Sequence, residues 1–332
     1  MTKLIITTGD VNGIGIEVFV KALLKSEIQQ LLKSHELTFC GNSETFKEYV
    51  VKAKLPVDFK DDSFSVGGIF LKVLECENYA PVEFGRETKR PAQLAAEALD
   101  KAAQATVLKE FDAILTLPVS KHALQNVGWN FPGQTEMLAH AAGADNPMMI
   151  LCSGRLRVAL ATIHIPLKDV AAVIFKERIK EKITTLFTTL WEDFATPNPK
   201  IAVLGLNPHA GEAGAIGSEE IEVLKPAIEE CFKSGIDVDG PHPADGFFAH
   251  GAFKNYDGIL AMYHDQGLIP LKLIANGAGV NVTANLPIVR TSPDHGTAYA
   301  IAGKNMADEA STAEAIQLAL EIVESRRNFL KR

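Results

Sequence analysis

The sequence predicts an α/β protein whose sheet is largely parallel. Short runs of apolar, β-forming residues alternate along the chain with longer segments of helical periodicity. Several of the short runs are apolar at almost every position, which is typical of strands covered on both faces. The 332 residues, 47% of them hydrophobic, are enough for about two domains with substantial cores.

Six runs are predicted to form strands because each is short and apolar. Most are followed directly by glycine, proline or a polar residue, where a turn toward the next helix is expected. In chain order the expected strands are Leu4–Thr8, Leu37–Cys40, Ala113–Leu117, Val158–Ile163, Ile201–Leu206 and Ile259–Met262.

Four longer segments are predicted to form helices. The first runs from Pro91 to about Glu110 and begins with proline, which is favoured at the first helical position. Its continuation, AQLAAEALDKAAQA, is rich in strong helix formers. The other three are Lys176–Asp193, Ser218–Ser234 and Asp308–Arg327. No shift in composition separates the domains, so we expect them to be interleaved.

The charge balance excludes two classes of partner. The chain has 33 Lys and Arg against 41 Asp and Glu residues, a formal net charge of −8. A broad basic surface for nucleic acid or for an anionic membrane is therefore not expected. Small anionic ligands stay possible, because a local cluster of cations can bind a phosphate whatever the net charge.

Cysteine usage and hydropathy indicate a cytoplasmic protein. The four cysteines are scattered and form no CxxC pair, which argues against a disulfide framework or a thiolate zinc site; they are Cys40, Cys76, Cys152 and Cys231. The first residues lack the apolar stretch and cleavage site of a signal peptide. No segment reaches the roughly 20 apolar residues of a membrane span.

Three of the expected strands carry a histidine at or just after their carboxyl end. His164 ends RVALATIH, His209 ends IAVLGLNPH and His264 ends GILAMYH. Ligands of open α/β sheets bind outside the carboxyl ends of the strands, so three converging imidazoles would suit a catalytic divalent metal. The alternative for each is a hydrogen bond that caps the strand end. Histidines without this context are expected to be structural: His35, His122, His140, His242 and His250.

A glycine-rich turn, TGDVNGIGIE, follows the first strand. Gly9, Gly13 and Gly15 permit a tight turn and a close backbone approach at a helix N-terminus, which suits an anion. A turn that binds no ligand is the alternative. The spacing is not G-x-G-x-x-G, so the dinucleotide fingerprint of the Rossmann fold is absent.

Two neighbouring segments offer groups for an anionic substrate. In TLPVSK, Lys121 lies in a loop at the carboxyl end of a strand. FPGQTEMLA then offers Gln134, Thr135 and Glu136 before an apolar helix. Thr135 could instead cap that helix.

The segment from Pro270 to Asp308 is dense in polar groups that a core would not contain. Lys272, Asn281 and Arg290 can donate hydrogen bonds to phosphate or carboxylate, Arg290 through a bidentate fork. For Lys272, an exposed surface position is the alternative. Earlier in the chain, Asp245 in GPHPADGFF is either a turn residue or a carboxylate that orients a ligand.

Several of these segments are motifs that occur together in one enzyme family. In chain order they are Gly9–Glu17, TLPVSK, PGQTE, LNPHAGE, GPHPAD, MYHDQG and RTSPDHGTAYAIAGK. Together they resemble the 4-hydroxythreonine-4-phosphate dehydrogenase family of pyridoxal phosphate biosynthesis, over essentially the whole chain.

The resemblance implies a fold and a reaction. It implies two α/β/α lobes around a central cleft, as in isocitrate and isopropylmalate dehydrogenases, with a dinucleotide site that is not of the Rossmann type. Residues 1–125 plus 268–332 would form the dinucleotide-side lobe, and 126–267 the metal and dimerisation lobe. The implied reaction is NAD- or NADP-dependent oxidation of 4-phosphooxy-L-threonine to 2-amino-3-oxo-4-phosphooxybutanoate, which then loses CO2 to give 3-amino-2-oxopropyl phosphate.

The resemblance also implies partners and residue roles. It implies a homodimer with one divalent metal, zinc, magnesium or cobalt, in each active site at the interface. The metal histidines fall on His164, His209 and His264, of which His264 would come from the partner subunit. Substrate-binding positions fall on Gln134, Thr135, Lys272, Asn281 and Arg290, and Asp245 and Lys272 are the candidate general bases; the resemblance assigns no cofactor-binding residue.

This chain departs from the family at two places. GDVNGIGIE stands where the family has GDPAGIGPE, so Val11, Asn12 and Ile16 are replacements. Gln134 stands where the family has histidine, and glutamine neither carries a positive charge nor transfers a proton. Oxidation of a related substrate such as 4-phosphothreonate is therefore an alternative, and a non-catalytic metal- or phosphate-binding protein is a more remote one.

Overall fold

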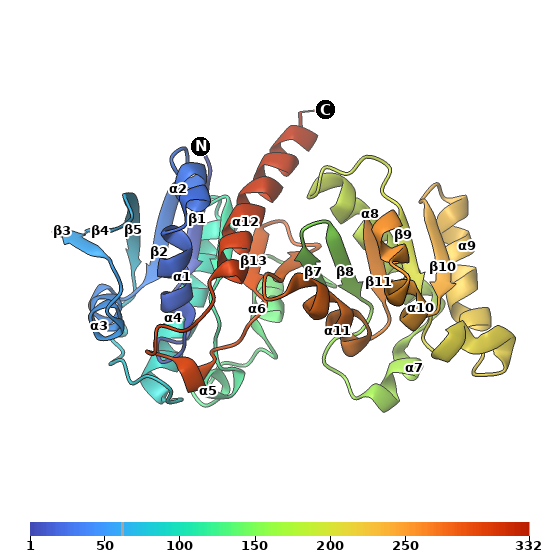
Figure 1. The fold of residues 1–332 in the computed structure, drawn as a ribbon, viewed down its shortest axis with the longest axis horizontal. Helices are drawn as coiled ribbons and strands as arrows, with labels where there is room; N and C mark the ends of the chain where they lie inside the picture. Colours follow the sequence, from blue (N-terminus) through green and yellow to red (C-terminus); the bar gives the residue numbers. More distant parts are fainter. Residues whose placement is uncertain (61–62, 332) are drawn as a thin grey trace. The chain divides into compact units, whose positions relative to one another are not determined.

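The protein is described by a computed structural model that covers residues 1–60 and 63–331 (Figure 1). It consists of two compact units, Met1–Pro147 with Leu286–Val323, and Met148–Asn285 with Glu324–Arg332. Both boundaries lie later than the expected 125 and 268. The physical reason is that strands 148–153 and 280–284 pair with each other, which keeps the chain between them in the second unit.

The first unit is built on a sheet with the strand order β13-β6-β1-β2-β5-β4-β3. The strands from β13 to β5 run parallel, and β4 and β3 are added antiparallel. The central strands are buried at almost every position, as their apolar sequences predict. The bounds are β1 (Lys3–Thr7), β2 (Glu36–Gly41), β3 (Asp58–Lys60), β4 (Ser63–Val66), β5 (Ile69–Glu75), β6 (Ala113–Thr116) and β13 (Val289–Pro293).

The helices of this unit each bury apolar side chains. On α4, for example, Leu94, Ala98 and Ala102 recur at a spacing of four and are all buried, and the helix packs against β1, β2 and β6. The helices are α1 (Gly15–Leu23), α2 (Ser26–Leu32), α3 (Ser43–Ala53), α4 (Lys89–Val107), α5 (Lys121–Gln125), α6 (Gln134–Ala141) and α12 (Ala310–Phe329), whose last turns belong to the second unit.

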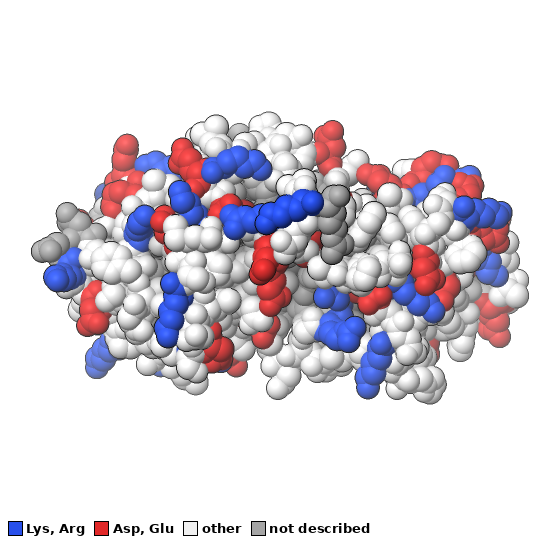
Figure 2. All heavy atoms as spheres, turned by 90° about the horizontal axis from the view of Figure 1, so that it is seen from above, with Lys and Arg blue, Asp and Glu red and all other residues white. Residues whose placement is uncertain are grey.

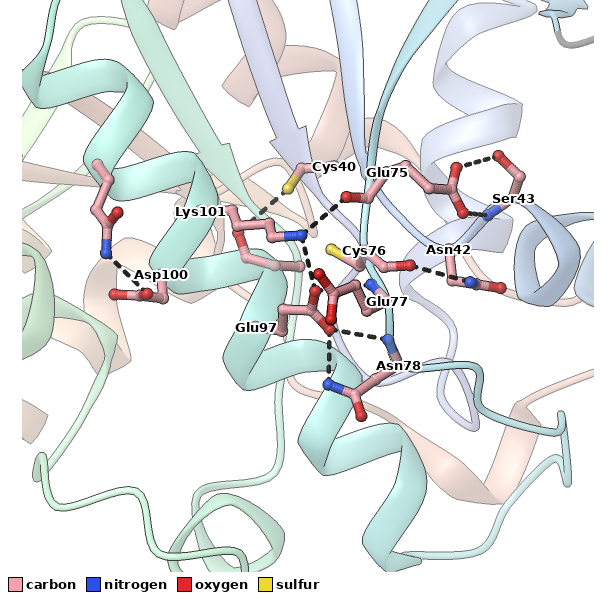
Figure 3. Close-up of polar contacts among 12 residues, drawn as sticks. Cys40, Asn42, Ser43, Glu75, Cys76, Glu77, Asn78, Glu97, Asp100 and Lys101 are labelled. Carbon is pink, nitrogen blue, oxygen red and sulfur yellow. Dashed lines mark hydrogen bonds and ion pairs between the residues drawn. The ribbon is translucent and has the colours of Figure 1, made fainter.

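A polar network joins α4 to the loop after β5 (Figure 3). The Glu97 carboxylate accepts hydrogen bonds from the backbone N–H of Glu77 (2.7 Å) and of Asn78 (3.0 Å). It also pairs with Lys101 at 2.9 Å, and Lys101 donates to the Glu75 carbonyl at 3.0 Å. Partial burial opposes ionisation of Glu97, but these hydrogen bonds outweigh it and lower its pKa to about 2.

The second unit is built on a sheet with the order β10-β9-β11-β8-β7-β12. The first four strands run parallel, whereas β7 is antiparallel to both β8 and β12. A tight turn at Gly154, which has φ +54°, joins β7 to β8. The bounds are β7 (Met148–Ser153), β8 (Leu156–Leu160), β9 (Ile201–Leu204), β10 (Val238–His242), β11 (Gly258–Ala261) and β12 (Val280–Ala284).

The helix expected over 218–234 forms as two pieces. A π-helical turn, η3 (Glu220–Leu224), precedes α9 (Lys225–Lys233), and Pro226 stands at the start of α9. Proline has no N–H to donate, so it favours a new helix start at this point. The other helical elements are α7 (Val170–Val173), α8 (Lys176–Glu192), α10 (Ala244–Ala249), α11 (His264–Ala275), and the short turns η1 (Leu167–Asp169), η2 (Pro208–Gly214), η4 (Ala252–Asn255) and, in the first unit, η5 (Tyr299–Ile301).

Charged side chains of both signs are interspersed over the face shown in Figure 2. They do not gather there into one basic region, in agreement with the acidic balance of the sequence. Among the described helices, none combines the length and apolar character needed to cross a membrane.

Candidate active site

The three histidine-bearing strands, β8, β11 and β9, are neighbours and run parallel. Their carboxyl ends therefore lie at one edge of the sheet, as the histidine site requires. The Thr162 hydroxyl donates to the Met262 carbonyl (2.7 Å), which ties the end of β8 to that of β11. The Gln266 side chain accepts the Met262 N–H (2.7 Å) and donates to the Gly205 carbonyl (2.6 Å), which ties β11 to β9.

Two of the three histidines lie close together. The ring centres of His164 and His264 are 5.9 Å apart, short enough for both rings to share one cation. Nδ1 of His264, the first residue of α11, lies 2.7 Å from Oδ1 of Asp265. An ionised carboxylate only accepts hydrogen bonds, so Nδ1 is the donor in this contact and Nε2 is the ring nitrogen that a metal could reach.

His209 is held differently. It is exposed and lies in η2, where the five residues from His209 to Ala213 all have positive φ, between 42° and 76°. Within residues 1–60 and 63–331, no three His, Cys, Asp or Glu side chains form a group that could hold a metal ion. The structure thus brings His164 and His264 close together. Among the described residues of one chain, His209 does not complete a three-ligand metal site with them.

Three further predicted residues also lie in the second unit. Asp245 is exposed in the first turn of α10, and α10 packs against η2, which carries His209. Lys272 is exposed near the end of α11, eight residues and about 12 Å along the axis from His264. Asn281 lies on β12, and its Oδ1 is buried with no hydrogen-bond partner among the described residues. A buried acceptor of this kind suits a donor group of a ligand.

The remaining predicted residues lie in the first unit, around Arg290. Arg290 of β13 is 4% exposed. It donates to Oγ1 of Thr116, at the end of β6, from Nε (3.2 Å) and from Nη2 (2.8 Å). Burial lowers its pKa to about 10, and the negative charge of Glu136 opposes this shift. Arg290 is therefore a buried cation at neutral pH.

Gln134 is the first residue of α6 and links Arg290 to β6. Its Oε1 accepts from Nη2 of Arg290 (3.2 Å), and its Nε2 donates to the Leu117 carbonyl (3.3 Å). Thr135 is the second helical residue and is buried, and the N-cap is Gly133. The capping alternative for Thr135 is therefore wrong. The Nζ of Lys121 lies 3.6 Å from the position of a Cβ built on Gly133, beside the start of the same helix.

The glycine-rich turn is used for close packing between loops. Gly9 has φ +65°, and a Cβ there would lie 2.7 Å from the carbonyl oxygen of Pro118. A Cβ on Gly13 would lie 2.6 Å from the carbonyl oxygen of Thr297. The close contact with neighbouring backbone is therefore a sufficient reason for glycine at both positions, without a bound anion. Burial raises the pKa of Asp10 in this turn, and the hydroxyl of Tyr299 donates to its carboxylate at 2.6 Å.

Asn12, one of the replacements in this turn, is fully buried and holds a neighbouring loop. Its Oδ1 accepts the Glu83 N–H (2.6 Å), and its Nδ2 donates to the Arg86 carbonyl (2.8 Å) and to the Thr88 hydroxyl (3.2 Å). An alanine, the residue of the family motif, could make none of these bonds.

Four of the histidines expected to be structural have partners of their own. His122 contacts Glu87, His242 bonds Asp239 (2.6 Å), His35 accepts the Thr2 N–H (3.2 Å), and His140 packs on Phe131 with ring centres 5.4 Å apart. Thr116, which accepts hydrogen bonds from Arg290, and Glu220, which accepts the backbone N–H of Asn207, carry no local motif and were not expected from the sequence. The signal that could have pointed to Glu220 is the concentration of glycines before it in LNPHAGEAGAIGSEE.

Comparisons with known proteins agree on one family. The sequence model of the family described as pyridoxal phosphate biosynthetic protein PdxA matches residues 23–319. The chain is 40% identical over 326 residues to 4-hydroxythreonine-4-phosphate dehydrogenase of Bacteroides thetaiotaomicron, covering 97% of this chain and 89% of the relative. The crystal structure of 4-hydroxythreonine-4-phosphate dehydrogenase from Klebsiella pneumoniae has a TM-score of 0.82 at 33% identity, covering 97% of this chain and 100% of that one.

A more distant structure supports the fold alone. Isocitrate dehydrogenase from Methylococcus capsulatus has a TM-score of 0.50 at 15% identity, covering 100% of this chain and 89% of that one. The expected non-Rossmann architecture is thereby confirmed. With a family match over most of its length and near full-length similarity to curated dehydrogenases, the chain belongs to the pyridoxal phosphate biosynthetic PdxA family of 4-hydroxythreonine-4-phosphate dehydrogenases.

Proposed function

We propose that this protein oxidises 4-hydroxythreonine 4-phosphate with NAD or NADP, as a step of pyridoxine 5'-phosphate synthesis. The observation that carries the proposal is similarity over 97% of the chain to a dehydrogenase of that name. The immediate product is 2-amino-3-oxo-4-phosphooxybutanoate, a β-keto acid. It loses CO2 to give 3-amino-2-oxopropyl phosphate.

The substrate phosphate or carboxylate is bound by the cationic group of the first unit. Arg290 supplies a buried, permanently charged guanidinium, and Lys121 lies beside the same helix start. Gln134 and Thr135 fix the orientation of the ligand at the start of α6. Lys272, which is exposed, and Asn281, which has a buried acceptor, are also proposed as substrate contacts.

His164, His209 and His264 hold the divalent metal in this proposal. The closeness of two rings and the Nδ1 contact of His264 support it. Imidazole nitrogens suit zinc or cobalt, whereas magnesium prefers oxygen ligands, so we rank magnesium last. A bound cation would lower the pKa of the substrate hydroxyl and draw electron density toward the new carbonyl as CO2 leaves.

The oxidation needs an acceptor for one proton while hydride passes to the nicotinamide ring. We assign the proton to the Asp245 carboxylate, because its helix packs against the turn that carries His209. Lys272, the other candidate, lies about 12 Å farther along α11 and fits a substrate contact better. In the second step the bond to the carboxylate breaks, its electron pair enters the ketone, and the resulting enol takes up a proton at carbon.

We further propose that the active enzyme is a homodimer with the metal site at the interface, where the partner can complete the ligand set. Apolar side chains are exposed on α11, the helix that begins at His264: Ile269 is 59% exposed, Leu273 78% and Ile274 45%. Exposed apolar groups in one stripe are typical of a surface covered by another chain. A cytoplasmic location is part of the proposal, since all four cysteines are free.

Steady-state rates test the substrate. The purified protein, loaded with Zn²⁺ or Co²⁺, is assayed for formation of reduced nicotinamide with 4-hydroxythreonine 4-phosphate and with 4-phosphothreonate, each with NAD and with NADP. We expect the first substrate to have the higher kcat/KM. A higher kcat/KM for 4-phosphothreonate would instead support the related dehydrogenase, an alternative that the Gln134 replacement leaves open. If no reduced nicotinamide forms with either substrate while the metal is present, the result would support a non-catalytic binding protein.

A further inference from the structure

The turn that carries His209 has a backbone that needs support. Its five consecutive residues with positive φ include four that are not glycine. Side chains other than glycine rarely adopt this region, and such residues persist only where the surrounding structure holds them. The question is therefore which groups hold the turn.

A buried carboxylate fastens the start of the turn. Glu220 is 1% exposed at the beginning of η3. Its Oε1 accepts the backbone N–H of Asn207 at 2.7 Å, and its Oε2 accepts the Asn207 side-chain amide at 3.0 Å. The same amide donates to Oε2 of Glu219 at 2.7 Å. Asn207 is thus bound at both backbone and side chain, two residues before His209.

Three glycines leave room for this arrangement. A Cβ on Gly211 would lie 2.5 Å from Oε2 of Glu220, and one on Gly217 would lie 2.5 Å from Nδ2 of Asn207. A Cβ on Gly205 would lie 2.9 Å from the Cα of Ala210. At these three positions the chain is therefore packed too closely around Glu220, Asn207 and Ala210 to admit a side chain. Close packing of Gly211 on the carboxylate and of Gly217 on its partner Asn207 indicates that the Glu220–Asn207 contact determines the shape of the turn.

We propose that Glu220 is a positioning residue for His209: through Asn207 it fixes the backbone from which the imidazole projects, and so sets the affinity for the divalent metal. The inference rests on the metal site of the proposed function and adds a residue outside the ligand set. Because Glu220 acts only through His209, its removal should matter only when His209 is present.

Metal titration of the full-length protein tests this. Co²⁺ binding is measured by calorimetry for the wild type, Glu220→Gln, His209→Ala and the double variant. We expect Glu220→Gln to weaken Co²⁺ binding roughly 10- to 100-fold, as loss of a supporting residue does at other metal sites. In the double variant we expect no weakening beyond that of His209→Ala alone, since the two changes remove one interaction. Glu222→Gln, an exposed glutamate on the same element, is the matched control and should bind as the wild type.

Three results would overturn the inference. The first is unchanged Co²⁺ affinity in Glu220→Gln when His209→Ala has lost affinity; the proposed metal site then stands and only the positioning role fails. The second is a double variant whose Co²⁺ affinity is lower than that of His209→Ala by the same factor that Glu220→Gln alone lowers the wild-type affinity. The third is unchanged affinity in His209→Ala, which removes the metal assignment itself. If Glu220→Gln does not fold, Asn207→Ala, which keeps the carboxylate and removes its partner, is measured in its place with the same expectations.

Discussion

The candidate site residues of the two units differ in how they are held before any ligand binds. In the first unit, Arg290 is buried and its guanidinium already bonds Thr116 and Gln134. In the second, His209 is exposed on a turn with positive φ, and Nδ1 of His264 contacts the exposed carboxylate of Asp265. The comparison teaches that the proposed anion contact is already fixed by hydrogen bonds inside the protein, whereas the proposed metal ligand His209 lies on an exposed turn that other residues must hold in place.

The largest effect should follow from removing the buried cation. Arg290→Met is expected to lower kcat/KM by about 100-fold or more, mainly through KM, because hydrogen bonds to a charged group are lost from the substrate. Arg86→Met removes an exposed arginine of the same unit, 74% exposed at its side chain, and should leave kcat/KM unchanged. An unaltered KM in Arg290→Met would mean that the substrate anion binds elsewhere.

Metal should stabilise the second unit. Zn²⁺ or Co²⁺ at about 100 times its Kd is expected to add about 2.7 kcal/mol to the free energy of unfolding, seen as a rise in Tm. His264→Ala should abolish that rise, and His250→Ala, an exposed histidine outside the site, should keep it. An equal metal-induced rise in Tm in His264→Ala would show that His264 is not a metal ligand.

Position 134 should control the pH dependence of substrate binding in the first unit. In Gln134→His, an imidazolium forms as the pH falls through about 6.5 and adds a positive charge beside Arg290. The ratio of its KM to the wild-type KM should therefore fall roughly threefold to tenfold as the pH is lowered from 7.5 to 5.5. This factor corresponds to about 1 kcal/mol, the energy of two unit charges that interact near water. Taking the ratio cancels the titration of the substrate phosphate. A ratio that stays constant with pH would place Gln134 outside the anion site.

The smallest effect concerns the polar network of α4. The pKa of Glu97 is lowered in the folded state from 4.5 to about 2, so ionised Glu97 stabilises the fold above pH 4.5, and this contribution is lost as the pH falls toward 2. Glu97→Gln should lower the free energy of unfolding by about 1 kcal/mol at pH 7, measured by urea denaturation. The difference from wild type should shrink below pH 4.5. Glu77→Gln, an exposed glutamate of the same loop, should show no such difference.

Local patterns in the sequence were sufficient to predict the central strands. The apolar runs that became β1, β6, β9 and β11 are buried throughout, so their hydrophobicity alone identifies them. Because β8, β9 and β11 are parallel neighbours, the segments that carry the three histidines begin at one edge of the sheet. The rings of His164 and His264 lie 5.9 Å apart there, whereas His209 lies on the exposed η2 turn.

The parts that were missed depend on contacts between distant residues. The pairing of β7 with β12 joins Cys152 to Val280, and no local spacing indicates such a partner, so the unit boundary was placed too early. Thr116 and Glu220 act through residues brought to them by the fold, and each is an ordinary residue in its own segment. The capping alternative for Thr135 failed because Gly133 begins the helix two residues earlier.

The central claim is that histidines from three strand ends bind one divalent metal while Arg290 binds the substrate anion. Anomalous diffraction from a crystal grown with Co²⁺ and soaked with 4-hydroxythreonine 4-phosphate tests it most directly. We predict one strong cobalt peak bound by His164, His209 and His264, drawn from one chain or from two, with the substrate anion on Arg290. A peak bound by other residues, or a substrate anion away from Arg290, would contradict the account.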